Sequence, residues 1–95
     1  MIDPKLIAKL CKALSVEKRV RMLALLRERA YCVNAIARLL EITPAAVSQH
    51  LRILRDLDLV EAKKSGYFVH YKVDHNSLTR LMTLLNNLLT PPEES

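Results

Sequence analysis

The side chains best suited to binding another molecule lie between residues 43 and 52. Gln49 and Arg52 are three positions apart, so on a helix they share one face, and Ala45 and Ser48 lie beside them. In the DNA major groove a Gln can bind adenine, an Arg can bind guanine, and the methyl group of an Ala can contact that of thymine. An ordinary amphipathic helix with a solvated polar face would show the same pattern, so the rest of the chain has to decide between the two interpretations.

The helix that would carry these side chains is predicted to be the second of a helix-turn-helix unit over residues 34–58. Thr43 suits the N-cap position, and Pro44 suits the first helical position, where its missing N–H is not needed. The first helix is predicted over 34–41. The turn contains no Gly, and a positive φ at Glu41 would cost about 1–2 kcal/mol. The buried edge of the second helix is expected to consist of Val47, Leu51 and Leu54.

The sequence of residues 59–73 predicts a basic β-hairpin. Residues 59–63 favour a strand, 64–66 contain the only Gly of the chain, and 67–73 alternate strictly between two faces. Lys63 and Lys64 would then lie near the tip. A helix-turn-helix followed directly by such a hairpin is typical of a winged helix, whose hairpin, the wing, can reach backbone phosphates or the minor groove. An isolated hairpin is only marginally stable, so this one should pack on the helices.

Both ends of the chain are predicted to form apolar helices that a winged helix does not need for DNA reading. The first covers 4–13 with Asp3 as its N-cap, and the last covers about 77–90, capped by Asp74 or Asn76. Residues 1–14 and 75–90 are therefore interpreted as dimerisation helices of a two-fold homodimer. The alternative is that they only cover the core of one monomer. A dimer would place two reading helices about 34 Å apart and favour an inverted-repeat operator.

A further helix is expected over 16–29, capped by Ser15. Residues 1–30 hold eight Lys and Arg against three acids, so Lys18, Arg19 or Arg21 could contact phosphates, although a solvated helix surface is the more common explanation for any one of them. The inner side of this helix is predicted to consist of Val16, Val20, Leu23, Leu26 and Ala30, with Met22 and Leu25 widening the stripe.

The 95 residues suit a single domain, 1–95, with 91–95 as a disordered tail. The formal charge of +5 and the pI near 9.5 suit a polyanionic partner. We expect a cytoplasmic protein with no membrane contact, because no signal peptide or long apolar run is visible and two cysteines do not form a disulfide framework. An enzyme is not expected, since there is no nucleophile–base pair, carboxylate pair or glycine-rich phosphate loop.

Over residues 12–73 the chain resembles the ArsR/SmtB family of bacterial winged-helix repressors. Its most specific part is Val47-Ser48-Gln49-His50-Leu51, and the flanking matches are Lys12-Ala13-Leu14-Ser15, Ile36-Ala37-Arg38-Leu39-Leu40 and Gly66-Tyr67-Phe68-Val69-His70-Tyr71. Glu41 replaces the usual Gly, and Tyr67 stands where a wing Arg is frequent. The resemblance implies repression of a promoter until a metal, metalloid or reactive sulfur species changes the dimer.

This chain has fewer cysteines suited to such sensing than the pattern of the metal-sensing family members contains. Arsenic and cadmium sensors of this kind carry Cys-Val-Cys where this chain has Cys32-Val33-Asn34, and Cys11 is the only other thiol. Two thiolates suit an arsenical, a soft metal ion completed by His or water, or a reversible disulfide. Alternatively, Cys11 lies on the apolar face of its helix as a small hydrophobic residue. A metal site in the last helix is not favoured, because Asp74 and His75 at its start are the only candidate ligands and no acid or His follows them within the helix.

The sequence therefore predicts a mainly α winged helix-turn-helix with five helices, a two-stranded β-wing and a homodimer through the terminal helices. Its expected function is that of a DNA-binding repressor released by a metalloid, soft metal or thiol-reactive signal. A winged-helix protein-interaction module and a constitutive regulator without an inducer are the alternatives. His50 is expected either to serve a phosphate or to make a packed hydrogen bond. The candidate DNA contacts are Thr43, Ala45, Ala46, Ser48, Gln49, His50, Arg52, Lys63 and Lys64.

Overall fold

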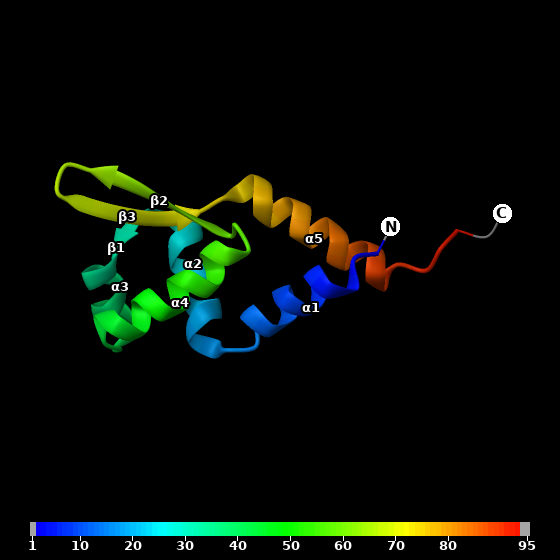
Figure 1. The fold of residues 1–95 in the computed structure, drawn as a ribbon, viewed down its shortest axis with the longest axis horizontal. Helices are drawn as coiled ribbons and strands as arrows, with labels where there is room; N and C mark the ends of the chain where they lie inside the picture. Colours follow the sequence, from blue (N-terminus) through cyan, green and yellow to red (C-terminus); the bar gives the residue numbers. More distant parts are fainter. Residues whose placement is uncertain (1, 94–95) are drawn as a thin grey trace.

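The computed structural model describes residues 2–93 and shows a winged helix with one further helix at each end of the chain (Figure 1). The helix-turn-helix and the wing form one end of the molecule, and the first and last helices lie side by side as an arm at the other end. The molecule measures 56 × 24 × 20 Å. The elements, in order, are α1 (Pro4–Ala13), α2 (Glu17–Glu28), β1 (Tyr31–Cys32), α3 (Val33–Leu40), α4 (Pro44–Asp56), β2 (Val60–Ser65), β3 (Phe68–Val73) and α5 (His75–Leu89).

The wing belongs to an antiparallel sheet with the strand order β1-β3-β2. The predicted hairpin is confirmed, but its turn is shorter than the predicted 64–66: Lys64 and Ser65 pair with Val69 and Phe68, so the turn consists of Gly66, at φ 63°, and Tyr67. The two-stranded wing is joined by a third strand that the sequence did not predict, β1, in which Tyr31 pairs with Tyr71 and Cys32 pairs with His70. Two residues are too few to show an alternating pattern, so periodicity could not find this strand.

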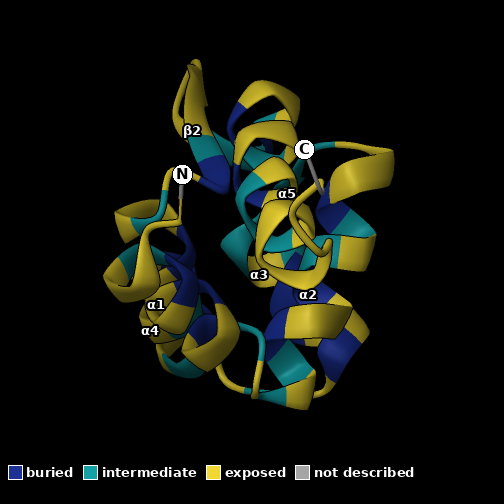
Figure 2. Ribbon diagram, turned by 90° about the vertical axis from the view of Figure 1, so that its right-hand side faces the viewer, coloured by how far each residue is buried: buried dark blue, intermediate teal, exposed yellow. Residues whose placement is uncertain are grey.

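The core lies where α2, α3 and α4 pack under the sheet, and Figure 2 shows the buried faces of the helices turned inward. Val47, Leu51 and Leu54 are buried, as predicted for the inner edge of α4. Of the predicted inner stripe of α2, Met22 and Leu26 are buried, whereas Val20 is 47% exposed and its placement inside is wrong. The buried face of α2 also includes Arg19, so the helix is rotated from the orientation that its aliphatic residues alone suggested.

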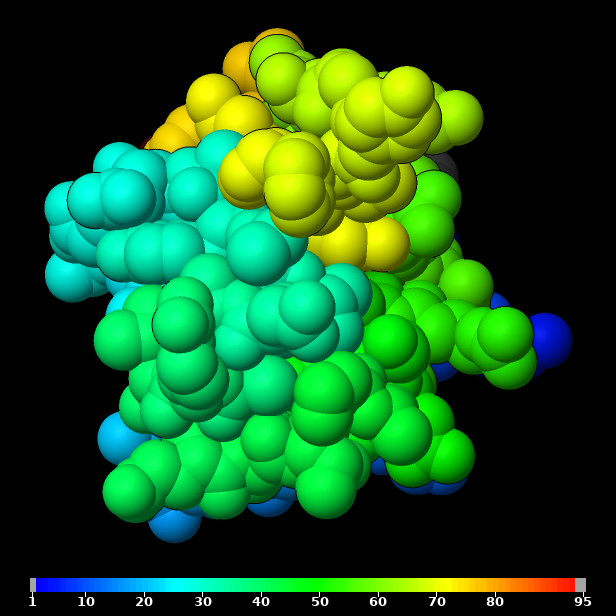
Figure 3. Space-filling model, turned by 90° about the vertical axis from the view of Figure 1, so that its left-hand side faces the viewer, coloured from blue at the N-terminus to red at the C-terminus, as the bar shows by residue number. Residues whose placement is uncertain are grey.

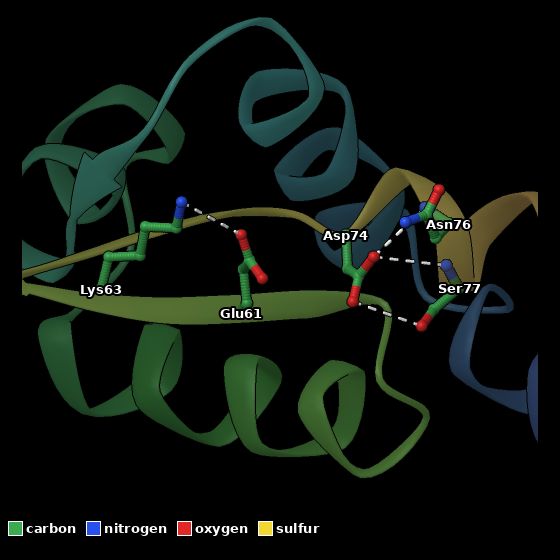
Figure 4. A network of polar contacts seen from close by, with 5 residues as sticks. All are labelled: Glu61, Lys63, Asp74, Asn76 and Ser77. Atoms are coloured by element: carbon green, nitrogen blue, oxygen red, sulfur yellow. Dashed lines mark hydrogen bonds and ion pairs between the residues drawn. The ribbon is translucent and has the colours of Figure 1, made fainter.

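Helix ends follow the capping predictions with one exception. Asp3 and Thr43 cap α1 and α4 as expected. Asp74 caps α5, where one carboxylate oxygen accepts the N–H groups of Asn76 and Ser77 at 3.1 and 3.3 Å (Figure 4). Ser15 does not cap α2. Its hydroxyl donates to the Lys12 carbonyl at 2.6 Å instead, and the N-cap of α2 is the next residue, which has no side-chain hydrogen bond.

The terminal arm leaves apolar surface uncovered in the single chain. On α5, Leu81 packs into the core while Met82, Leu88 and Leu89 are exposed, and Ile2 is exposed at the start of the chain. No helix within residues 2–93 is long and apolar enough to cross a membrane. Of the predicted disordered tail, 91–93 are exposed and 94–95 lie outside the described residues.

Candidate nucleic-acid interface

The polar face of α4 is exposed along the whole length that sequence reasoning assigned to base contact. Ala45, Ser48, Gln49 and Arg52 are all exposed, on the side of α4 opposite the buried edge. Ala46, also predicted to contact DNA, is half-buried. A helix whose outer face carries only small and hydrogen-bonding side chains can approach a groove closely, so the geometry suits the base-reading interpretation.

The turn before α4 fixes the direction of this face. Glu41 adopts the left-handed conformation, with φ 57° and ψ 45°, so the positive φ considered for this position does occur. The N–H of Ile42 bonds back to the Ala37 carbonyl at 3.1 Å, which closes the end of α3. Thr43 Oγ1 then accepts the Ala46 N–H at 3.1 Å and starts α4. Thr43 is thus used as a cap, and its hydroxyl proton can still be donated to a phosphate.

A hollow of about 370 Å³ lies between α4 and the sheet. Ser48, Arg52 and Arg55 of α4 line it, together with Asp56 and with Tyr71 from β3. The ion pairs within residues 2–93 join Arg27 to Glu28 and Lys63 to Glu61, so neither Arg52 nor Arg55 is paired with an acid. Sequence reasoning missed Arg55 as a candidate contact, although its spacing of three from Arg52 places both on adjoining parts of one face.

The wing projects beside the helix-turn-helix, and Figure 3 shows both on the same end of the molecule. Lys63 and Lys64 are exposed, as a phosphate-contacting pair should be. Lys63 Nζ lies 3.6 Å from a Glu61 carboxylate oxygen (Figure 4). Because both partners are solvent-exposed, this pair is weak and can exchange for a phosphate. Tyr67 is fully exposed next to Gly66 at the tip of the wing.

His50 is half-buried on α4 and lies against Arg19. Arg19 Nη1 lies 3.3 Å from His50 Nδ1, and because a guanidinium can only donate, Nδ1 is the acceptor. Burial, followed by the nearby positive charge of Arg19, lowers the pKa of His50 below its ordinary value. Of the two roles considered for His50, the packed hydrogen bond is the one present in this structure.

Lys18 and Arg19 both bind the carbonyl ends of other helices. Lys18 Nζ donates to the Leu40 carbonyl at the end of α3, at 3.1 Å. Arg19 Nε donates to the Ala13 carbonyl at 2.6 Å, and its Nη2 donates to the Lys12 carbonyl at 3.3 Å. Cations at helix C-termini are favourable because the backbone dipoles leave partial negative charge there. The suggestion that these two residues contact phosphates is therefore not supported, whereas Arg21 is exposed.

The two cysteines are free and lie on separate parts of the fold. Cys11 is exposed on α1, so in the single chain it is not one of the small buried residues that its place on the apolar face suggested. Cys32 is half-buried at the N-cap of α3, and Figure 1 draws α1 and β1 well apart. Cys32 instead pairs across the sheet with His70, which places the two side chains on the same face. Within residues 2–93 no three His, Cys, Asp or Glu residues group as metal ligands.

The amino-acid sequence is similar to those of known bacterial regulatory proteins. Residues 17–62 match the family model described as bacterial regulatory protein, arsR family. The chain is 35% identical over 81 residues to the cadmium resistance transcriptional regulatory protein CadC homolog of Staphylococcus aureus, covering 84% of this chain and 67% of that one. It is 32% identical over 79 residues to the transcriptional activator HlyU of Vibrio cholerae, covering 83% and 73%.

Solved structures agree with these matches. A homodimeric winged helix-turn-helix DNA-binding domain from Mycobacterium bovis superposes with a TM-score of 0.73 at 28% identity, covering 90% of this chain and 79% of that one. An ArsR-like transcriptional regulator from Rhodococcus sp. RHA1 superposes with a TM-score of 0.79 at 26% identity, covering 88% and 79%.

Proposed function

The chain belongs to the ArsR family of bacterial regulatory proteins, and we propose that it acts in the cytoplasm as a homodimeric repressor that binds an inverted-repeat operator. The observation that carries this proposal is the exposed polar face of α4 beside a hollow that holds two arginines without acid partners. A buried edge of Val47, Leu51 and Leu54 fixes that face outward. Positively charged, hydrogen-bonding side chains on a rigid helix suit the major groove.

The contacts divide into two groups by chemistry. Gln49 and Arg52 have the amide and guanidinium groups that can bind a base edge through two hydrogen bonds, so they are assigned base recognition. Thr43, Ser48 and Arg55, and Lys63 and Lys64 of the wing, are assigned to the phosphate backbone, where they set position but not sequence preference.

The homodimer is proposed from the uncovered surface of the arm. Met82, Leu88 and Leu89 are exposed on α5, and Met82 and Leu89, seven positions apart, lie on the same face of the helix. The Mycobacterium bovis relative with this fold is homodimeric. A two-fold axis through the arms would bring α5 against its copy and place the two α4 helices on one side of the DNA.

The test of the DNA-binding proposal is a fluorescence anisotropy titration with the DNA upstream of the gene. Gln49→Ala with Arg52→Ala should weaken binding by at least tenfold, because the removal of each base contact costs about 1–3 kcal/mol. Arg27→Ala is the matched control, since Arg27 is exposed on α2 and pairs with Glu28. If the double variant is folded and binds as tightly as wild type, α4 is not the reading helix.

Release from DNA is proposed to depend on a thiol-binding signal, namely an arsenical, a soft metal ion or a thiol-reactive species. One relative is named for cadmium resistance. Within one chain Cys32 has His70 as its neighbour across the sheet, so a two-coordinate soft ion would use this pair, and Cys11 could take part only from the other subunit. Loss of DNA binding on adding cadmium should disappear in Cys32→Ser, whereas loss on adding phenylarsenoxide, which binds two thiolates, should disappear in either Cys32→Ser or Cys11→Ser. Equal release from wild type and Cys11→Ser with Cys32→Ser would exclude cysteine sensing.

A further inference from the structure

Arg19 is a buried cation without an acidic partner in the described part of the chain. It is only 8% exposed, and the ion pairs of residues 2–93 do not include it. Its hydrogen bonds go to two carbonyls of α1 and to His50, none of which carries a full negative charge. The end of a helix supplies roughly half a negative charge, so part of the charge of Arg19 remains uncompensated. Buried charges in proteins are normally paired.

This cation lines a cavity of about 330 Å³ between α1 and α4. Lys9 and Lys12 of α1 line the cavity together with Arg19, and Ile53 and Leu57 of α4 supply apolar surface. Figures 1 and 2 both draw α1 and α4 as neighbours in this part of the molecule. Three cations and an apolar wall in one concave site form the combination that binds a small molecule with an anionic head and a hydrocarbon body.

We propose that the α1–α4 cavity binds a small organic monocarboxylate, whose carboxylate lies among Arg19, Lys9 and Lys12 and whose hydrocarbon part packs on Ile53 and Leu57. Asp56 also lines the cavity and forms no ion pair among residues 2–93. Its negative charge makes the site less favourable for a doubly charged phosphate than for a single carboxylate. The volume is at the small end of ligand sites, which suits a medium-chain acid and is too small for a nucleotide.

The position of this cavity gives the ligand a route to DNA binding, a consequence that rests on the proposed function. One wall is α1, part of the proposed dimer arm, and the other is α4, the proposed reading helix. Arg19 joins the same two helices through the Ala13 carbonyl and His50. A carboxylate that attracts Arg19 would compete with these bonds and change how α4 is held relative to the arm.

The site is tested first without DNA, by calorimetric titration of the full chain with sodium octanoate. One saturable site per chain is expected, with much weaker binding of octanol, which lacks the carboxylate, and of octylamine, which carries the opposite charge. Lys9→Gln with Lys12→Gln should weaken octanoate binding by roughly three- to tenfold, since each exposed charge pair contributes up to about 1 kcal/mol. Lys5→Gln is the matched control, because Lys5 is exposed on α1 and does not line the cavity.

The variant Ile53→Glu tests the apolar wall, since it places a second carboxylate where the hydrocarbon should lie. Ile53 is already 39% exposed, so the fold should tolerate this change. Binding should be lost in Ile53→Glu and retained in Cys11→Ser with Cys32→Ser. Absence of saturable octanoate binding, equal binding of octanol, or unchanged binding in the double lysine variant would overturn the site.

A second titration, of protein bound to promoter DNA, tests the regulatory consequence separately. Octanoate should change the DNA affinity of wild type and leave that of Ile53→Glu unchanged. An equal effect on both proteins would overturn the regulatory role. Because octanoate binding is measured without DNA, a failure of the DNA-binding proposal would not be mistaken for a failure of the site.

Discussion

Replacement of Arg19 by Met is expected to be the most destabilising change of any charged residue in α2. Met has a similar length and apolar stem, so the substitution removes the guanidinium without opening a large cavity. It removes the short 2.6 Å bond to the Ala13 carbonyl and two longer bonds of 3.3 Å, to the Lys12 carbonyl and to His50. Ala13 is itself buried, so little water can replace the missing donor at its carbonyl.

The magnitude follows from these three bonds. A hydrogen bond from a charged donor contributes about 1.5–3 kcal/mol, and the short bond should be in that range. The two longer bonds are weaker and add about 1 kcal/mol together, while burying Met in place of a charge offsets part of this destabilisation. The net expectation is a decrease of about 2–4 kcal/mol in the free energy of unfolding. Arg19→Lys keeps the charge but cannot reach three acceptors, so a decrease of about 1–2 kcal/mol is expected.

The assay is urea unfolding followed by circular dichroism at one fixed protein concentration, because the stability of a dimer depends on concentration. Arg21→Met is the matched control, since Arg21 is on the same helix and exposed, and it should change stability by less than about 0.5 kcal/mol. A decrease for Arg19→Met no larger than that of the control would refute the view that Arg19 holds α1, α2 and α4 together.

Three further variants test His50, the wing and the turn before α4. Because the pKa of His50 is lowered in the folded state, the unfolded chain binds a proton at this residue more readily than the folded chain does. The contribution of neutral His50 to stability is therefore present above about pH 6.5 and is lost as the pH falls through the folded-state pKa. His50→Gln should remove that part of the pH dependence of the free energy of unfolding, measured by urea unfolding at a series of pH values. Lys63→Ala with Lys64→Ala should weaken binding to all DNA sequences similarly and lower the slope of log K against log salt by about 1 for each phosphate contact that is removed, whereas a change in sequence preference would contradict a backbone role. Glu41→Gly should raise the free energy of unfolding, measured in urea, by about 0.5–1 kcal/mol, because a φ of 57° strains any residue with a Cβ. A decrease instead would show that the Glu41 side chain makes a stabilising interaction that outweighs this strain.

The parts of the fold that could be predicted are those set by local chemistry. Pro44 after Thr43, and the spacing of Val47, Leu51 and Leu54, define α4 independently of the rest of the chain. Alternation over 67–73 with Gly66 before it defines the hairpin in the same way. Each of these patterns acts within about ten residues, so the sequence displays it directly.

The parts that could not be predicted depend on contacts between distant residues. Arg19 is buried because two carbonyls of α1 and the ring of His50, 31 positions away, surround it, and no local pattern marks a cation for burial. Because helical spacing could not foresee that Arg19 is buried, it wrongly placed Val20 on the buried face of α2. The pairing of Cys32 with His70 depends on β1, a strand of only two residues, so the neighbour of that thiol appears only in the folded chain.

The most direct test of the central claim, that α4 reads base edges, is the ratio of promoter affinity to non-specific DNA affinity at one salt concentration, measured for wild type and Arg52→Ala. Removing a base contact from an exposed helix face should lower promoter affinity by roughly 5- to 150-fold and non-specific affinity far less, so the ratio should fall. Equal decreases of affinity for both DNAs in Arg52→Ala would show that Arg52 contacts only the phosphate backbone. If the ratio of the two affinities is also unchanged in Gln49→Ala, base reading by α4 is contradicted.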